Sequence, residues 1–172
     1  MKKFFKIILS IILGSALLFF ILLGTYVVVN WQGVIEPFQV GNPDATNKIL
    51  IASQGSEFKN NLLNNLVQQL ETEDNYLFVV DCTKLDSETV TEWDAIVIIH
   101  SAQMHEMPGA AELFLKRAAD HSKVMLVSTS GAGDDKVEGF DVDAISTASH
   151  IEITHKLLNW LIPRIESKLW TI

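Results

Sequence analysis

The stretch that decides the fold is KILIASQGSEFKNNLLNNLVQQL, residues 48–70. It opens with a short apolar run that ends at Ser53, and it then passes through the turn residues Ser-Gln-Gly-Ser. The residues after the turn place apolar side chains at helical spacing: Phe58, Leu62, Leu63, Leu66, Val67 and Leu70. This order predicts a strand over 48–53, a tight turn and an amphipathic helix.

Similar apolar runs follow along the chain. YLFVV (76–80), WDAIVII (93–99) and KVMLVS (123–128) are apolar on consecutive residues, which is what a strand buried on both faces requires. A shorter strand is expected over 142–146. Helices are expected from Met107-Pro108 to Arg117, where the proline suits a first helical turn, and from Ser149, which forms a capping box with Glu152.

Strands that alternate with helices at this spacing require parallel, right-handed crossovers. The sequence therefore predicts the α/β class, with a parallel sheet covered on both faces as a three-layer sandwich. Such sheets bind ligands outside the carboxyl ends of their strands. We expect three loops to converge there: residues 53–59, 101–107 and 129–135.

The N-terminus carries IILSIILGSALLFFILLGTYVVV (7–29), an apolar run without one charge. At about 1.5 Å per residue it reaches roughly 35 Å, enough to cross the ~30 Å hydrocarbon layer. Lys2, Lys3 and Lys6 precede it and no Lys or Arg follows before Lys48, so residues 1–6 are predicted to be cytoplasmic, residues 7–29 to span the membrane and everything after Asn30 to be extracytoplasmic. A cleaved signal peptide is the alternative, although its apolar core is usually shorter, roughly 7–15 residues.

Composition limits the remaining chain to a tether over 30–47 and one domain over 48–172. After Asn30 there are 10 basic and 21 acidic residues, a net charge of −11 from 10 minus 21. This acidic balance argues against a nucleic-acid partner and against electrostatic docking on anionic lipid. The single Cys82 excludes an internal disulfide and a cysteine-based zinc site.

Three segments together resemble the flavodoxin-like superfamily, which includes flavodoxins and flavodoxin-related quinone and FMN reductases. They are DAIVIIHSAQMHEMPGAAELFLKR (94–117), KILIASQGSEFKNNL (48–62) and KVMLVSTSGAG (123–133). The resemblance covers residues 48–166, and it implies a parallel sheet of five strands in the order 2-1-3-4-5. A segment over 131–140 stands where the family has another helix, so this looks like a trimmed, membrane-anchored flavodoxin.

The resemblance also implies FMN bound at the three loops. Physically, a phosphate binds hydroxyls and backbone N–H groups at a helix N-terminus. The expected cofactor-binding residues are Ser53, Gln54, Gly55, Ser56, Phe58, Lys59, Ser101, Ala102, Gln103, Met104, Thr129, Ser130 and Gly131. The first loop is about one residue shorter than the flavodoxin pattern, Glu57 would repel an anion, and the second loop lacks a stacking Tyr or Trp. A simple strand-to-helix turn capped by Ser56 is the alternative.

His105 is the expected catalytic residue, because an imidazole beside a reduced flavin or quinone can donate a proton near neutral pH. A solvent-exposed histidine without a role is the alternative, and no metal site is predicted. DAISTAS (143–149) resembles a degenerate form of the motif at which flavin transferases attach FMN covalently, although a helix cap at Ser149 explains the same residues. The expected function is FMN-dependent electron transfer to or from a membrane quinone or redox protein. A flavin-free module for tethered binding or assembly is the alternative.

Overall fold

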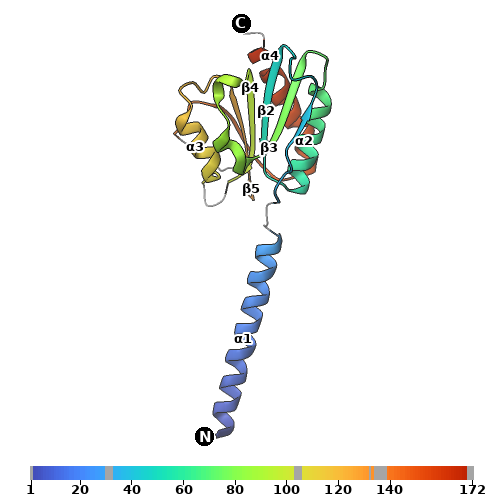
Figure 1. The fold of residues 1–172 in the computed structure, drawn as a ribbon. Helices are drawn as coiled ribbons and strands as arrows, with labels where there is room; N and C mark the ends of the chain where they lie inside the picture. Colours follow the sequence, from blue (N-terminus) through green and yellow to red (C-terminus); the bar gives the residue numbers. More distant parts are fainter. Residues whose placement is uncertain (1, 30–32, 103–105, 132, 134–138, 170–172) are drawn as a thin grey trace. The chain divides into compact units, whose positions relative to one another are not determined.

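The computed structural model describes residues 2–29, 33–102, 106–131, 133 and 139–169 (Figure 1). The chain divides into two compact units, Met1–Gln32 and Gly33–Ile172. The first holds one helix, α1 (Lys2–Val29), whose segment Lys3–Val28 is long and apolar enough to span a membrane or to act as a signal anchor. The length and composition of α1 thus agree with the apolar run identified in the sequence.

The second unit is built on a six-stranded sheet in the order β1-β3-β2-β4-β5-β6. Strands β2 to β6 pair in parallel, as expected for the α/β class. The strands are β1 (Phe38–Val40), β2 (Asn47–Ser53), β3 (Asn75–Asp81), β4 (Ala95–Ser101), β5 (Val124–Ser130) and β6 (Asp143–Ala148).

The predicted sheet of five strands in the order 2-1-3-4-5 is wrong at one edge. β1 adds a sixth strand outside β3 and runs antiparallel to it, with Phe38 opposite Val79 and Val40 opposite Leu77. This strand lies inside residues 30–47, where the sequence analysis expected only a tether. Three residues with one apolar alternation are too short to stand out as a strand in the sequence.

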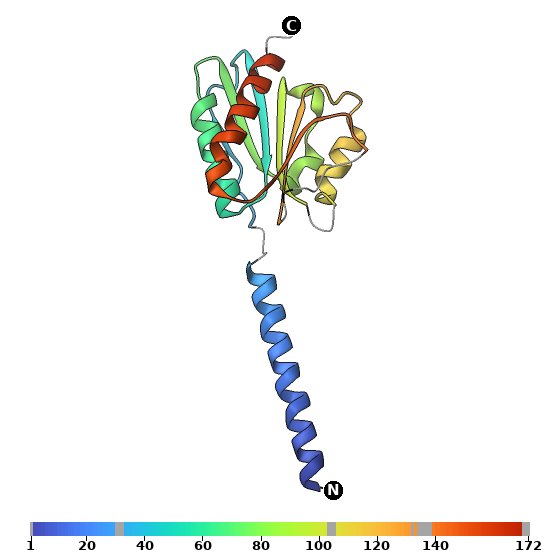
Figure 2. The same ribbon diagram turned by 180° about the vertical axis from the view of Figure 1, so that it is seen from behind.

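Helices cover both faces of the sheet (Figures 1 and 2). α2 (Glu57–Leu70) and α4 (Thr154–Leu169) lie side by side on one face, while α3 (Gly109–Arg117) and the 3-10 helix Cys82–Ser87 lie on the other. Strand side chains alternate between the two cores: Ile49 and Ile51 pack under α2 and α4, whereas Leu50 and Ala52 pack toward α3. The central strands are therefore apolar on consecutive residues because both of their faces are buried.

The predicted helix start at Ser149 is wrong. β6 continues to Ala148, a 3-10 turn follows over Ile151–Ile153, and α4 begins at Thr154. The residue before the 3-10 turn, His150, makes no side-chain cap. Its backbone N–H instead donates to the Ala148 carbonyl, at 3.0 Å. The chain therefore turns between strand and helix through backbone hydrogen bonds rather than through the expected capping box.

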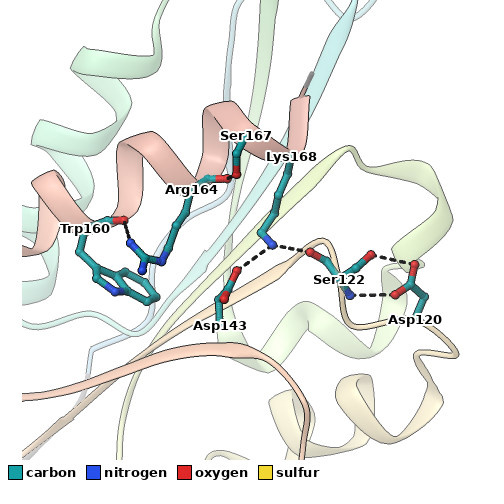
Figure 3. A network of polar contacts seen from close by, with 7 residues as sticks. All are labelled: Asp120, Ser122, Asp143, Trp160, Arg164, Ser167 and Lys168. Atoms are coloured by element: carbon teal, nitrogen blue, oxygen red, sulfur yellow. Dashed lines mark hydrogen bonds and ion pairs between the residues drawn. The ribbon is translucent and has the colours of Figure 1, made fainter. Parts of the chain in front are cut away.

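Polar contacts attach the end of α4 to the amino ends of β5 and β6 (Figure 3). The Nζ of Lys168 lies 2.8 Å from Asp143 Oδ2 and also donates to the Ser122 carbonyl. Asp120 in turn accepts hydrogen bonds from both the backbone and the hydroxyl of Ser122, at 2.8 and 2.9 Å. These contacts lie at the sheet edge opposite the carboxyl ends, so they anchor the scaffold without entering the candidate site.

Gly41, which follows β1, provides a test of whether β1 belongs to the fold. Its φ is +88°, and a Cβ there would lie 2.2 Å from the Asn75 carbonyl oxygen. We predict that Gly41→Ala lowers the free energy of unfolding by at least roughly 1–3 kcal/mol. The control is Gly109→Ala, where nothing lies within 4 Å of the added carbon. Urea unfolding of the full chain in detergent micelles measures both, and equal midpoints would contradict the prediction.

Candidate functional site

The carboxyl ends of β2, β4 and β5 bring polar side chains together, as expected for ligand sites in parallel sheets. Register places Ser53 of β2 beside Ile99 of β4, and Ser101 of β4 beside Thr129 of β5. Ser56, the N-cap of α2, and Lys59, in its first turn, also lie at this carboxyl end of the sheet, which we call the carboxyl edge. Residues from all three predicted loops therefore meet at one end of the sheet.

Lys59 places a charged amine among the hydroxyl groups at the carboxyl edge. Its side chain is only 1 % exposed, and its Nζ donates to Ser101 Oγ at 2.8 Å and to Ser56 Oγ at 3.4 Å. Burial lowers the pKa of Lys59 from 10.5 to about 8, while Cys82 raises it by a smaller amount. The amine is thus mainly protonated at neutral pH, and a cation removed from water attracts anions more strongly than an exposed one.

Hydrogen bonds join the three loops to one another. The Ser101 N–H donates to Gln54 Oε1 at 2.7 Å, and the Gln54 N–H donates to the Ile99 carbonyl at 3.1 Å. Thr129 Oγ1 lies 3.3 Å from Ser101 Oγ, and the Ala102 N–H donates to the Thr129 carbonyl at 2.8 Å. The loops are therefore held in place by the chain's own polar groups.

Ser56 caps α2, as the alternative interpretation of the first loop expected. Its Oγ accepts from the Lys59 N–H at 3.3 Å. Phe58 is 4 % exposed and packs in the core under α2, so it contributes to the core. The cap and the Lys59 side chain share one hydroxyl, which fixes the amine at the start of the helix.

A segment that the sequence analysis missed covers the first loop. The Gly33 N–H donates to the Gly55 carbonyl at 2.6 Å, and the Gly55 N–H donates to the Gly33 carbonyl at 2.7 Å. A Cβ on Gly55 would lie 2.7 Å from the Gly33 carbonyl carbon, so only glycine permits this approach. The Ile35 N–H adds a hydrogen bond of 2.9 Å to Asp81 Oδ2. We call residues 33–37 the strap.

The remaining predicted residues occupy less central positions. Ser130 Oγ accepts from the Gly133 N–H at 2.9 Å, and Gly131 is exposed beside it. Gln103, Met104 and the predicted catalytic residue His105 lie outside the described residues. Their roles therefore stay predictions.

His100 precedes Ser101 on β4 and so faces the opposite side of the sheet. It is fully buried, with Nε2 2.8 Å from Ser128 Oγ. Burial lowers the pKa of His100 from 6.5 to about 4, the nearby Ser101 backbone raises it by less, and Lys59 lowers it further. His100 is therefore neutral at physiological pH and belongs to the core under α3.

Cys82 also lies beneath this edge. Its thiol is buried and donates to the Ile99 carbonyl, with Sγ and O 3.6 Å apart. Burial raises the pKa of the Cys82 thiol, Asp81 adds to the increase, and Lys59 opposes it. Since the thiolate is the reactive form, Cys82 is a structural residue of the core.

No family model matches the chain, and a search of curated proteins found no match. Among solved structures, the chain is similar to Smu.1420 from Streptococcus mutans UA159, with 13 % sequence identity and a TM-score of 0.41. The similarity covers 71 % of this chain and 98 % of that one. At this distance it identifies neither a family nor an activity.

The burial of His100 predicts a loss of stability in acid. Between about pH 6.5 and 4 the unfolded chain binds a proton at this residue and the folded domain does not, so the free energy of unfolding falls as pH falls. The loss approaches about 3 kcal/mol at pH 4. We predict that His100→Gln removes this share of the pH dependence.

The matched control is His155→Gln, because His155 is exposed on α4. Urea unfolding of the full-length variants from pH 4 to 8 checks the prediction. Carboxylates titrate in the same acid range, so the difference between each variant and the wild type is the quantity to compare. An unchanged slope in His100→Gln would contradict the prediction.

Proposed function

We propose that the chain is a membrane-anchored flavodoxin-like protein that binds FMN and exchanges electrons with a membrane quinone or a redox protein. The observation that supports this most directly is the buried Lys59 amine among hydroxyls at the carboxyl edge of the sheet. Ser56 and Ser101 contact that amine, and Thr129 contacts Ser101. A cation with converging hydroxyl groups at a helix start is suited to a phosphate.

The residues present fit the phosphate end of FMN better than its ring. Lys59 supplies the charge, and the hydroxyls of Ser56, Ser101 and Thr129 supply hydrogen bonds of either polarity. Loop 101–107 contains no Tyr or Trp to stack on a flavin, so Ala102 and Met107 would border the ring by apolar contact. FMN, when bound, supplies reversible one- and two-electron transfer.

The membrane helix favours a quinone or redox protein as the electron partner. α1 supports a single-pass anchor in the cytoplasmic membrane, and the lysines at its start favour an extracytoplasmic domain. NAD(P)H is scarce outside the cytoplasm, which argues against direct use of that reductant. His105 remains the proposed proton donor to a reduced flavin or quinone.

A second candidate function is a flavin-free module for tethered binding or assembly. The specific observation that favours it is the pair of hydrogen bonds between Gly33 and Gly55. This pair occupies a backbone N–H that a phosphate would use in the first loop. The lack of a stacking aromatic in loop 101–107 points the same way.

Replacing Lys59 tests the proposal. We predict that Lys59→Met weakens FMN binding by roughly ten- to a hundredfold, the range expected for one hydrogen bond to a charged group. Burial lowers the pKa of this amine from 10.5 to about 8, so the cost of the buried charge grows as pH falls from about 10.5 to 8 and stays constant below that. Removing the charge therefore leaves the domain folded at pH 7. The control is Lys156→Met, an exposed position on α4.

The measurement is the absorption spectrum of the purified full chain in detergent micelles, before and after addition of FMN. A bound flavin shifts and structures the visible absorption bands, which gives the dissociation constant by titration. Wild-type protein that neither carries nor takes up FMN would contradict the proposal and leave the flavin-free module. Equal affinities in Lys59→Met and Lys156→Met would exclude Lys59 as the phosphate ligand.

Orientation is tested separately. We predict that a reporter active only outside the cytoplasm is active when it is fused after Ile172. The reason is that Lys2, Lys3 and Lys6 stay on the cytoplasmic side during insertion. Activity of a reporter that functions only in the cytoplasm would reverse the orientation and restore NAD(P)H as a reductant.

A further inference from the structure

Two features of the first loop conflict. Lys59 and its hydroxyl neighbours are suited to an anion, but the Gly55 N–H beside them already donates to the Gly33 carbonyl at 2.7 Å. A carbonyl oxygen carries a partial negative charge and accepts a hydrogen bond as a phosphate oxygen does. The strap therefore presents to the loop the same kind of acceptor that a ligand would present.

We infer that the strap occupies the first loop (residues 53–59) in the absence of ligand. The strap and a ligand phosphate then exclude each other at Gly55. The inference rests on the proposed function, because it concerns the same loop. It adds a regulatory element that the chain itself carries. Ligand binding then requires Gly33 to leave Gly55.

Steric contact supports mutual exclusion. A single carbon added to Gly55 would lie 2.7 Å from both the carbonyl carbon and oxygen of Gly33 and 3.0 Å from its Cα. Van der Waals contact between carbon atoms requires about 3.5 Å or more. No group of phosphate size fits on that side of Gly55 while the two glycines are paired. The backbone N–H also has only one hydrogen to donate.

The bonding pattern permits a local opening. Gly33 is joined to the first loop by two backbone hydrogen bonds, and the next hydrogen bond along the strap runs from the Ile35 N–H to Asp81 Oδ2. The Ile35 side chain also packs against the core. β1 is held separately by its ladder with β3. Gly33 can therefore separate from Gly55 while β1 remains paired, so opening does not require the sheet to unfold.

The strap also connects the loop to the membrane anchor. In the sequence, only residues 30–32 separate Gly33 from the end of α1 at Val29. When the strap is closed, Gly33 is the first described residue after α1 to bond to the sheet unit. Ligand binding would move this first attachment to later residues of the strap. Which described residue after α1 first bonds to the sheet would therefore depend on occupancy of the loop.

A pair of substitutions at one position tests the inference. Gly33→Pro removes the N–H that donates to Gly55, whereas Gly33→Ala keeps it and places its Cβ at an ordinary 3.5 Å from the Gly55 oxygen. Opening the strap in advance removes its competition with the ligand. We expect full-length Gly33→Pro in micelles to bind FMN roughly tenfold more tightly than wild type, and Gly33→Ala to bind as wild type does.

Riboflavin, which lacks the phosphate, identifies the part of the ligand that competes. Its affinity should be the same in wild type and Gly33→Pro. An equal gain for riboflavin and FMN would overturn the assignment of the strap to the phosphate loop. Equal FMN affinity in all three proteins, or weaker binding in Gly33→Pro, would overturn the inference and leave the proposed function intact. No FMN binding by any of them would overturn both.

Amide hydrogen exchange tests the inference without a variant, so the result stands even where Gly33→Pro fails to fold. In the wild-type chain, saturating FMN should release the Gly33 N–H from Gly55 and speed its exchange severalfold, while amides of β1 stay protected. Unchanged or slower exchange at Gly33 on FMN binding would overturn the inference.

Discussion

The structure depends on the burial of β2 between two neighbours. Residues Ile49 to Ser53 are fully buried, and their backbone pairs with β3 on one side and β4 on the other. Such a strand is stable only if helices cover both of its faces, since each alternate side chain must leave water. The loop after Ser53, the last residue of β2, therefore lies at the carboxyl end of the sheet. α2 begins after this loop and covers the face to which Ile49 and Ile51 point. The position of Lys59 follows from that geometry, because it lies in the first turn of α2.

The sequence predicted the parts of the fold that are decided by consecutive burial. Strands β2 to β5 are runs of consecutive apolar residues, and α2 has apolar residues at helical spacing. Each pattern predicts one type of element, and these elements lie where the patterns predicted them. β1 was missed because Phe38–Val40 is stabilised by pairing with β3 rather than by a pattern of its own. The start of α4 was misplaced because serine is a common N-cap residue, whereas backbone hydrogen bonds form the turn between β6 and α4. Local sequence composition therefore failed to predict elements that hydrogen bonding to other parts of the backbone determines.

The candidate site was predictable in location but not in detail. Parallel topology places the three loops together, and Lys59, Ser56, Ser101 and Thr129 were among the residues that the flavodoxin-like resemblance and their hydroxyl or amine groups led us to expect there. That Lys59 is buried could not be known, since a lysine in the first turn of a helix is usually exposed. The strap left an even weaker signal: Gly33 is one glycine in a segment with several turn residues. Its meaning appears only when its partner, Gly55, is seen opposite it.

The buried state of Cys82 makes the protein unusually suitable for chemical labelling. It is the one cysteine in the sequence, and its thiol lies inside the core with a raised pKa. A maleimide that reacts with thiolates will therefore leave the native chain unmodified while the domain is folded. A cysteine introduced at exposed Val34 would then be a unique attachment point for a fluorophore or spin label within the strap. A label at position 34 would show whether the strap moves, without any prior removal of cysteines.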